Sequence, residues 1–272
     1  MAELPRVSTV DFVTLRIPRI SVIVPVHDGE RFLRQSVDSI RAQRVSELEL
    51  IIVDDGSTDG TSDLIAELAP DIAIRLPENS GPATARNAGV AAATGEWLAF
   101  LDSDDLWTNA SLAVRSVLLA QTPNIDIVVG ATTPIVDDGT VLPPNVNVQD
   151  GDQSGGRVML FLNVGATLVR REAFESIGSF DESMRFGEDI DWYLRAREQQ
   201  FSTAYLDDVV LLYRRHDTNM TTDRAATEQG FLAAMKKSLD RRRTEGAAND
   251  LPPVDGLNVF DHLLPTPGTR RS

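Results

Sequence analysis

Three carboxylates follow a short apolar run near the middle of the chain. Residues 97–101 (WLAFL) form the run, and Asp102, Asp104 and Asp105 come directly after it. The run has the length of one strand that is buried on both faces. Because residues two apart share a face of a strand, Asp102 and Asp104 can aim at one point. Their oxygens suit a hard cation, Mg²⁺ or Mn²⁺, which can in turn hold the phosphates of a substrate. The alternative is a solvated loop in which one aspartate caps the next helix.

A second acidic pair ends another apolar run. Residues 48–53 lead into Asp54 and Asp55. A carboxylate such as Asp54 can accept hydrogen bonds from a nucleobase or a ribose. Two acidic clusters that both follow buried strands favour one shared site over two unrelated caps, since ligands of parallel sheets bind beyond the carboxyl ends of the strands.

Other polar side chains fall at the same edge or downstream. Pro25 and His27 close the first apolar strand, and Arg86 lies inside a helix of small residues, where a guanidinium can pair with phosphate or form a structural salt bridge. Asp189 begins a later helix and can act as a general base or as a capping acid; the helix dipole lowers the pKa of such a carboxyl and burial raises it. His216 is either a third metal ligand or the polar end of a strand.

The elements that must position these residues alternate between strand and helix over the first 120 positions. This alternation, with continuous apolar strands, is typical of a parallel sheet covered by helices on both faces, and we predict an α/β, Rossmann-like fold. The predicted strands are 20–26, 48–53, 72–76 and 97–101, and the predicted helices are 32–40, 58–68, 81–93 and 110–120.

The second half is less regular, and we expect it to add a smaller mixed sheet. The expected elements are strands at 125–130, 164–169 and 203–215, a hairpin turn at 137–140, a long loop at 143–156, and helices at 171–177, 187–199 and 222–243. We predict an N-terminal arm (1–19), one domain (20–219), and a C-terminal helix and tail (220–272).

Composition narrows the class of protein. The formal charge of −15 argues against binding to nucleic acid or anionic lipid, and the absence of cysteine excludes a disulfide framework and a cysteine nucleophile. No apolar run reaches the length of a membrane span, and the N-terminus lacks a signal-peptide core. We therefore expect a cytoplasmic location, or a peripheral one at the membrane. The C-terminal helix would also allow a homodimer.

Six short motifs, taken in order, resemble a known family. They are PVHDG (25–29), VDDGSTD (53–59), ARNAG (85–89), FLDSDD (100–105), GSFDE (178–182) and GEDIDWYLR (187–195). In this order and spacing they are similar to the family 2 inverting glycosyltransferases with the GT-A fold. The resemblance covers about residues 20–219, and it implies a nucleotide-binding half (20–130) and an acceptor half (131–219) on the side of the smaller mixed sheet. It implies a nucleotide-sugar donor, with a UDP-sugar expected, and a Mg²⁺ or Mn²⁺ cofactor.

The resemblance also implies roles for individual residues. The positions that match Pro25, His27 and Asp54 hold the nucleoside, and the arginine that matches Arg86 lies near the base and the phosphates. The DxD motif of the family corresponds to residues 102–104, so that Asp102 and Ser103 contact the donor, and Asp104 is the more direct of the two aspartate metal ligands.

Downstream, the ED pair of the family corresponds to Glu188 and Asp189, with Asp189 as the catalytic base. A histidine resembling His216 is a metal ligand or phosphate contact in some members. The acceptor remains unidentified: a glycan, lipid, peptide or small molecule would be gripped by residues 145–165 and by the surroundings of Glu188, Phe186 and Trp192.

The implied activity is a hexosyl or related glycosyl transfer by single displacement. The chain lacks the long membrane segments and the QxxRW-like motif of processive synthases, which favours a single addition. A haloacid dehalogenase phosphatase would need a DxDx[TV] motif at the first strand, and a sugar nucleotidyltransferase a GxGTR-like loop; neither is present. A non-catalytic nucleotide-sugar-binding or partner-binding module is the alternative that stays open.

Overall fold

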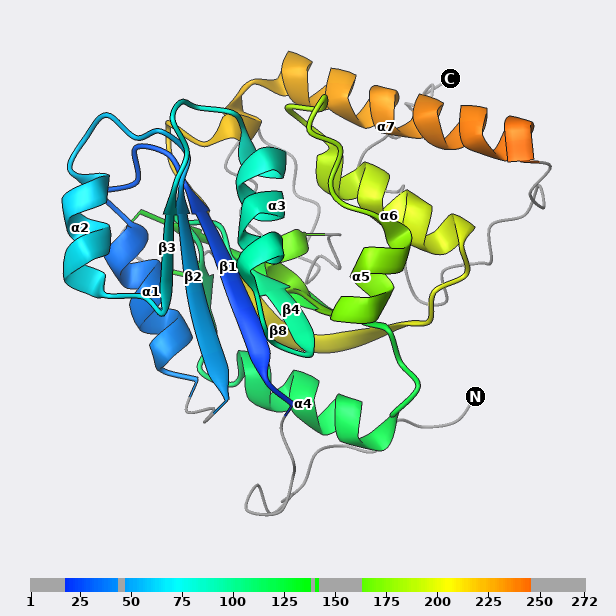
Figure 1. Cartoon of the computed structure of the whole chain (residues 1–272), viewed down its shortest axis with the longest axis horizontal. Coiled ribbons are helices and arrows are strands. Elements are labelled where there is room, and N and C mark those ends of the chain that lie inside the picture. The colour runs from blue at the N-terminus through cyan, green and yellow to red at the C-terminus, as the bar shows by residue number, and fades with distance from the viewer. Residues whose placement is uncertain (1–17, 44–46, 138–139, 142–162, 246–272) are drawn as a thin grey trace, which may run out of the picture.

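The apolar runs of the first hundred residues form the parallel half of an eight-stranded sheet (Figure 1). The computed structural model describes residues 18–43, 47–137, 140–141 and 163–245. Parallel pairing joins β3 (Ile72–Arg75), β2 (Leu48–Asp54), β1 (Ile20–Val26) and β4 (Trp97–Phe100) in that order. All side chains of β1 and β4 are buried, as their largely apolar sequences predict.

The mixed strands continue this sheet. The order runs on from β4 through β7 (Thr167–Arg170), β6 (Ile127–Val136), β8 (Thr203–Arg215) and β5 (Leu106–Trp107). Pairing is antiparallel at β4–β7, β6–β7 and β5–β8, and parallel at β6–β8. The smaller mixed sheet expected from the sequence is therefore not separate, because β7 pairs directly with β4.

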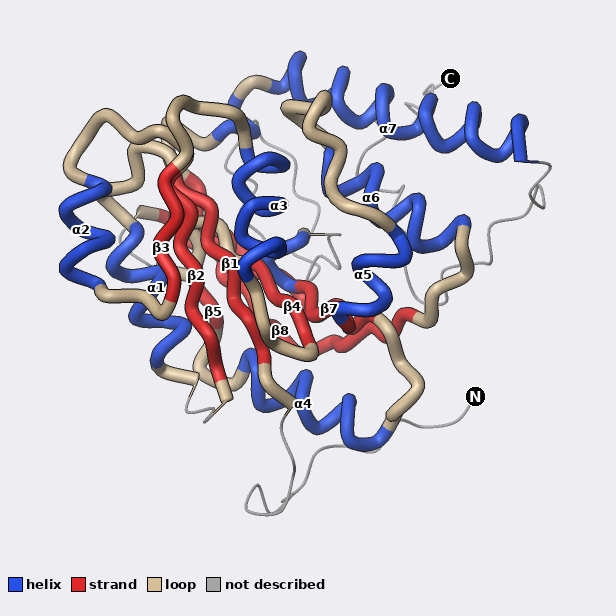
Figure 2. The backbone as a smooth tube through the Cα atoms, in the orientation of Figure 1, coloured by secondary structure: helices blue, strands red, loops and turns tan. Residues whose placement is uncertain are grey.

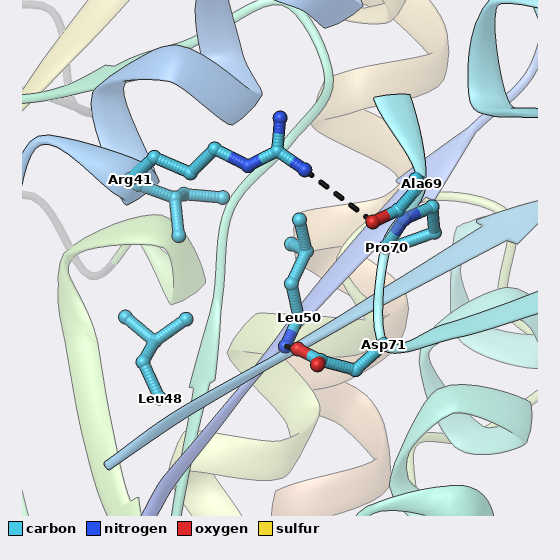
Figure 3. Close-up of a pocket in the computed structure, with 7 residues that line it drawn as sticks. Arg41, Leu48, Leu50, Ala69, Pro70 and Asp71 are labelled. Atoms are coloured by element: carbon cyan, nitrogen blue, oxygen red, sulfur yellow. Dashed lines mark hydrogen bonds between the residues drawn. The ribbon is translucent and has the colours of Figure 1, made fainter. Parts of the chain in front are cut away.

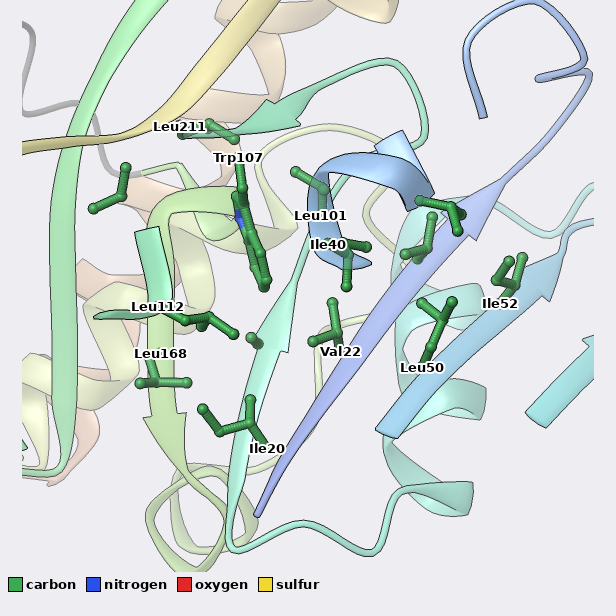
Figure 4. Packing of buried hydrophobic residues seen from close by; sticks show 14 of the residues in the cluster. Ile20, Val22, Ile40, Leu50, Ile52, Leu101, Trp107, Leu112, Leu168 and Leu211 are labelled. Atoms are coloured by element: carbon green, nitrogen blue, oxygen red, sulfur yellow. The ribbon is translucent and has the colours of Figure 1, made fainter. Parts of the chain in front are cut away.

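Helices cover both faces of the sheet (Figure 2). Alternate residues of each central strand point to opposite faces. Side chains of Ile20, Val22 and Val24 pack with α1 (Leu33–Arg41), α2 (Thr61–Leu68) and α4 (Ser111–Gln121). Ile23 and residues of β2 pack with α3 (Pro82–Ala92), α5 (Arg171–Ile177) and α6 (Glu188–Glu198). Figure 4 shows the first cluster, with Trp107 and Leu112 beside Ile20 and Val22.

Helix α7 (Arg224–Glu245) lies outside this arrangement and packs on α6 (Figure 1). Ala234 of α7 contacts Leu194 of α6 and Met184 of the preceding segment in a small apolar cluster. A 3₁₀ turn, η2 (Met220–Thr222), leads from β8 into α7. Among the described residues, no helix has both the length and the apolar character that crossing a bilayer requires.

Several predicted boundaries need correction. Helix α2 begins at Thr61, three residues later than expected, because the Asp59 carboxylate accepts hydrogen bonds from the Thr61 backbone N–H (2.9 Å) and hydroxyl. Residues 164–166 form a 3₁₀ turn, η1, before β7. Strand β6 extends to Val136, and the two-residue β5 was not expected.

The predicted hairpin turn is bracketed by an antiparallel bridge between Ile135 and Val141, although residues 138–139 lie outside the described residues. The remaining helices and strands fall within about two residues of their predicted ends. Three predicted segments lie outside the described residues. They are residues 1–17 of the N-terminal arm, the loop at 143–156, and the tail from residue 246 onward.

Candidate functional site

Helix α3 brings Arg86 over the carboxyl ends of the parallel strands. The helix starts after Gly81, whose positive φ of 94° suits glycine, and has Pro82 at its first position. Gly89 lets the helix approach β1 closely, since a Cβ atom there would lie 2.4 Å from Ile23 Cγ2. The guanidinium of Arg86 is thereby held at the edge where β4 ends.

Arg86 joins the two acidic motifs. Its Nη2 donates to Asp102 Oδ1 (2.6 Å) and its Nη1 donates to Glu188 Oε1 (2.7 Å). Arg86 is buried, which alone would lower its pKa, but the charges of Asp102 and Glu188 raise the pKa above its usual value. Its Nε atom is buried and has no hydrogen-bond partner among the residues that the structure describes. Of the two roles that the sequence allows Arg86, the structure shows the ion pair.

Asp189 stands beside this cluster on the first turn of α6. Gly187, with a φ of 77°, precedes the helix, and the Ile190 N–H donates to Asp189 Oδ1 (2.8 Å). Burial and the negative charge of Glu188 raise the pKa of Asp189 to about 7, against the opposing charge of Arg86. A carboxyl of that pKa, partly exposed to solvent, is suited to accept a proton near neutral pH.

The next acidic residue, Asp104, contacts His216. Asp104 Oδ2 lies 3.0 Å from His216 Nε2, and His216 Nδ1 lies 2.8 Å from Thr218 Oγ1. The ring of Phe32 packs against the imidazole with centroids 4.9 Å apart. The end of strand β8 thus brings His216 into contact with the segment that follows β4.

The predicted metal ligands are only partly assembled. Asp104 and His216 are in contact, whereas Asp102 pairs with Arg86. Within the described ranges, no group of three or more His, Cys, Asp or Glu side chains is arranged to hold a metal ion. The donor types nevertheless fit Mg²⁺ or Mn²⁺, since two partly exposed carboxylates and one imidazole lie on neighbouring segments.

Ser103 and Asp105 belong to the turn between β4 and β5. Ser103 lies near Gly29 and is partly exposed. Asp105 is fully buried, and its Oδ1 accepts from the Arg214 N–H (2.8 Å). Within the described part of the chain, its Oδ2 has no hydrogen-bond partner. Burial, followed by the charges of Asp104 and Asp102, raises the pKa of Asp105 well above its usual range.

The residues predicted to hold a nucleoside lie at the ends of β1 and β2. Pro25 is buried in β1, and the partly exposed His27 ring lies with Nδ1 2.8 Å from the Asp55 carbonyl oxygen. Asp54 points to the face of α2, where its oxygens accept from the Ser57 N–H (2.8 Å) and the Ser62 hydroxyl (2.7 Å).

Asp54 is therefore not brought to the Arg86 cluster. Burial by itself would raise the pKa of Asp54, but hydrogen bonds from Ser57 and Ser62 and the charge of Arg75 lower it. Asp55 points the other way, and its oxygens accept from the N–H groups of Ser80 and Gly81 (2.7 and 2.8 Å) at the start of α3. The role of Asp54 in nucleoside binding stays a prediction.

The residues predicted to contact the acceptor differ in their exposure to solvent. Trp192 is buried in the core, where it stacks on Phe174 (5.4 Å between centroids) and donates to the Gly178 carbonyl oxygen (3.0 Å), so it is not available to grip an acceptor. Phe186 is partly exposed and lies against Gly230 of α7. Residues 145–162 of the predicted acceptor segment lie outside the described residues.

Sequence reasoning missed Asn87, the neighbour of Arg86. Asn87 Nδ2 donates to the Phe180 carbonyl oxygen (2.9 Å), and the Phe180 N–H donates to Asn87 Oδ1 (3.0 Å). Consecutive residues of α3 therefore hold both ends of the segment from Phe180 to Glu188. The motifs ARNAG and GSFDE contain this pair, but their spacing alone does not show that they touch.

A separate hollow lies at the opposite, amino-terminal edge of the strands (Figure 3). Arg41 donates to carbonyl oxygens at the end of α2, and Asp71 accepts from the Leu50 N–H (2.7 Å). These contacts cap an α-helix and a strand, which accounts for the polar groups there. The hollow is not near the acidic motifs.

Comparison with known proteins decides the family. The family described as "Glycosyl transferase family 2" matches residues 21–178, more than half of the chain. The chain belongs to glycosyl transferase family 2. The matched residues include the turns after β1, β2 and β4, and Arg86.

Relatives of this family 2 chain include bacterial proteins. It is 30% identical to the uncharacterized glycosyltransferase EpsJ of Bacillus subtilis over 75% of this chain and 63% of that protein. It is 29% identical to the minor teichoic acid biosynthesis protein GgaA of the same organism, over 75% of this chain and 49% of that protein. The chain thus spans less than two thirds of the length of these relatives.

Solved structures share the fold. The mannosyltransferase PcManGT of Pyrobaculum calidifontis, in complex with GDP-Man and Mn²⁺, matches with a TM-score of 0.64 at 21% identity, over 87% of this chain and 66% of that one. Residues 1–349 of S. aureus TarS, in complex with UDP-GlcNAc, match with a TM-score of 0.62 at 21% identity, over 75% and 61%. The α/β fold with a mostly parallel sheet is that of the GT-A glycosyltransferases.

Proposed function

We propose that this chain is a metal-dependent inverting glycosyltransferase that moves a hexose or related sugar from a nucleotide-sugar donor to an acceptor hydroxyl or other nucleophile. The observation that carries the proposal is the Arg86 bridge, which joins Asp102 to Glu188 and so sets the acid-rich end of β4 beside Asp189. Donor-binding and proton-accepting groups are expected to lie this close in a single displacement.

Asp189 is the proposed base. Its pKa of about 7 leaves a large fraction ionised at neutral pH while keeping the carboxylate basic enough to take a proton. Glu188 neutralises part of the Arg86 charge, which would otherwise lower the pKa of Asp189 further. Attack by the deprotonated acceptor on the face opposite the leaving diphosphate inverts the anomeric centre.

Asp102, Asp104 and His216 are the residues that would hold Mn²⁺ or Mg²⁺. The bound ion would neutralise the negative charge of the leaving diphosphate. Arg86 adds a second positive charge near the same point, and its pairing with Asp102 keeps the guanidinium oriented toward the strand ends.

The nucleoside is proposed to lie over the ends of β1 and β2, against Pro25, His27, Asp54 and the Ser103 turn. The fold neighbours bind UDP-GlcNAc or GDP-Man, which supports a nucleotide-sugar donor, and a UDP-sugar is our proposal. The domain limits (20–219), a cytoplasmic or membrane-peripheral location and a homodimer also stay proposals.

The deciding experiment is a thermal-shift series with UDP- and GDP-sugars, with and without Mn²⁺, followed by assay of donor hydrolysis. A donor present at 100 times its Kd should stabilise the protein by about 2.7 kcal/mol. Asp104→Asn should abolish the Mn²⁺-dependent part of the shift, whereas Asp38→Asn, an exposed change on α1, should not. Equal shifts with and without Mn²⁺, or none with any donor, would contradict the proposal; binding without turnover would favour the non-catalytic module.

A further inference from the structure

The side chain of Asn219 connects three groups around the end of β8. Its Oδ1 accepts from the His216 N–H (2.5 Å), and its Nδ2 donates to Asp104 Oδ2 (3.3 Å) and to the Arg214 carbonyl oxygen (3.0 Å). Asn219 is buried, with 8% of its surface exposed. A buried amide with both ends satisfied has one orientation, so the groups that it contacts are held relative to one another.

From these contacts we infer that Asn219 is a positioning residue that sets the geometry of Asp104 and His216 as a pair of cation ligands. This inference rests on the proposed function. Asn219 acts through the Asp104 oxygen that also faces His216 Nε2 at 3.0 Å.

The chemistry of the amide suits this position. Asp102, Asp104 and Asp105 already place three carboxyl groups on the turn that follows β4. An asparagine supplies an N–H donor to Asp104 without adding a fourth negative charge, whereas aspartate would place a carboxylate against both Asp104 and a carbonyl oxygen.

Hydrogen bonds from Thr222 hold the backbone of Asn219 in place. Its carbonyl oxygen accepts from the Thr222 N–H (3.0 Å) and from the Thr222 hydroxyl (2.7 Å), at the turn that leads into α7. Arg214, fully buried, donates through Nε to the Asp104 carbonyl oxygen (2.7 Å). The backbone of Asp104 is thus held by Arg214 and its carboxylate by Asn219.

The test uses Asn219→Ala in the full chain, with Ser202→Ala as the matched control. Ser202 makes comparable hydrogen bonds, to Asp126 Oδ2 (2.6 Å) and the Asn124 carbonyl oxygen (3.0 Å), at the opposite end of β8. Mn²⁺ binding is measured from the free-ion electron paramagnetic resonance signal, in the presence of UDP or GDP. Loss of a ligand-orienting partner typically weakens metal binding 10- to 100-fold.

Asn219→Ala should therefore raise the Kd for Mn²⁺ at least about tenfold, while Ser202→Ala should leave it unchanged. A Kd within twofold of wild type, or an equal rise in Ser202→Ala, would overturn the inference.

A second readout does not require a metal. The ¹H–¹⁵N resonances of the His216 ring should shift in Asn219→Ala and not in Ser202→Ala, while those of His27 stay in place. Unchanged His216 resonances would also overturn the inference. If wild type binds no Mn²⁺ at all, the metal part of the proposed function fails, and the ring resonances alone then decide whether Asn219 positions His216.

Discussion

Arg86 of α3 donates a 2.7 Å hydrogen bond to Glu188 of α6, 102 positions later in the chain. The same guanidinium donates to Asp102 (2.6 Å), so one buried cation lies between the segment after β4 and the first turn of α6. Two carboxylates of distant motifs can approach each other only because this charge stands between them.

Removing the Arg86 guanidinium should lower the free energy of unfolding. Arg86→Met leaves Glu188 buried beside Asp102 and Asp189 without its counter-charge, and breaking a buried pair in this way costs about 3–5 kcal/mol. We expect the lower end of that range, because Asp102 is about one third exposed. Urea unfolding at pH 7 measures the loss.

The matched variant is Arg19→Met. Arg19 pairs with Glu49 at 3.0 Å, but half of its side chain is exposed, so the loss should stay below about 1 kcal/mol. Equal losses for the two variants would show that the Arg86 cluster is no more than a surface ion pair.

Asp189→Asn should abolish proton acceptance while leaving donor binding intact. General-base residues typically contribute about 10²–10⁴-fold, and we expect kcat to fall by that factor. Because the pKa of Asp189 is about 7, kcat/KM of the wild type should fall about tenfold per pH unit below that value. Near-normal transfer by Asp189→Asn would exclude it as the base.

The same pKa affects stability. It lies above the ordinary 3.8, so the folded protein binds this proton more tightly than the unfolded chain does. The stability that the protonated Asp189 contributes to the fold is therefore lost as the pH rises from about 4 to about 7. Asp189→Asn should be more stable than wild type at pH 8 and equal to it near pH 3, as measured by urea unfolding. A pH-independent difference would contradict this assignment.

Gly230 of α7 allows close contact with the segment before Asp189. A Cβ atom at Gly230 would lie 2.6 Å from both the Phe186 Cβ and its carbonyl oxygen. Alanine favours a helix by up to about 1 kcal/mol over glycine, but overpacking against backbone costs about 1–3 kcal/mol. Gly230→Ala should therefore lower the free energy of unfolding and also reduce kcat, by displacing the start of α6.

Gln229→Ala is the control for this change. Gln229 is exposed on the same turn of α7, and the substitution should be neutral or slightly stabilising in thermal unfolding. Retention of full stability and turnover in Gly230→Ala would show that α7 yields without moving Phe186.

Lys237 of α7 pairs with Asp181, in the segment between α5 and α6. Hydrogen bonds from Lys237 and Ser183 lower the pKa of Asp181 to about 2. A depressed carboxyl pKa stabilises the fold above its unfolded value of 3.8, and this stabilisation is lost as the pH falls through about 2.

Lys237→Met should accordingly cost less than about 1 kcal/mol at pH 7, because the pair is partly exposed and screened by solvent. The difference from wild type should shrink in 1 M NaCl and below pH 4, as measured by urea unfolding. A loss that persists under both conditions would have to come from packing of the lysine stem.

The sequence by itself determined the parallel half of the fold. Residues 97–101 are all apolar, and residues 20–26 are apolar except for Ser21; strands buried on both faces have this pattern. Because parallel strands place their carboxyl ends on one edge, the positions of Asp54 and Asp102 at that edge followed from the same pattern. The motifs in order were enough to indicate the family.

Only the tertiary structure decided which helix covers each face of the sheet and which residues each side chain contacts. Alternation predicts that Asp54 and Asp55 point to opposite faces, but not that α2 covers one face and α3 the other. Helical spacing likewise does not tell whether Trp192 faces the core or an acceptor, and packing against Phe174 decided for the core.

The links between Arg86 and Glu188, and between Asp104 and Asn219, join residues more than a hundred positions apart. Helix and strand propensities depend on residues that are only a few positions apart in the chain. Contacts at that separation depend instead on how helices and strands pack on both faces of the sheet. The sequence therefore determined which chemical groups are present, and packing determined which of them meet.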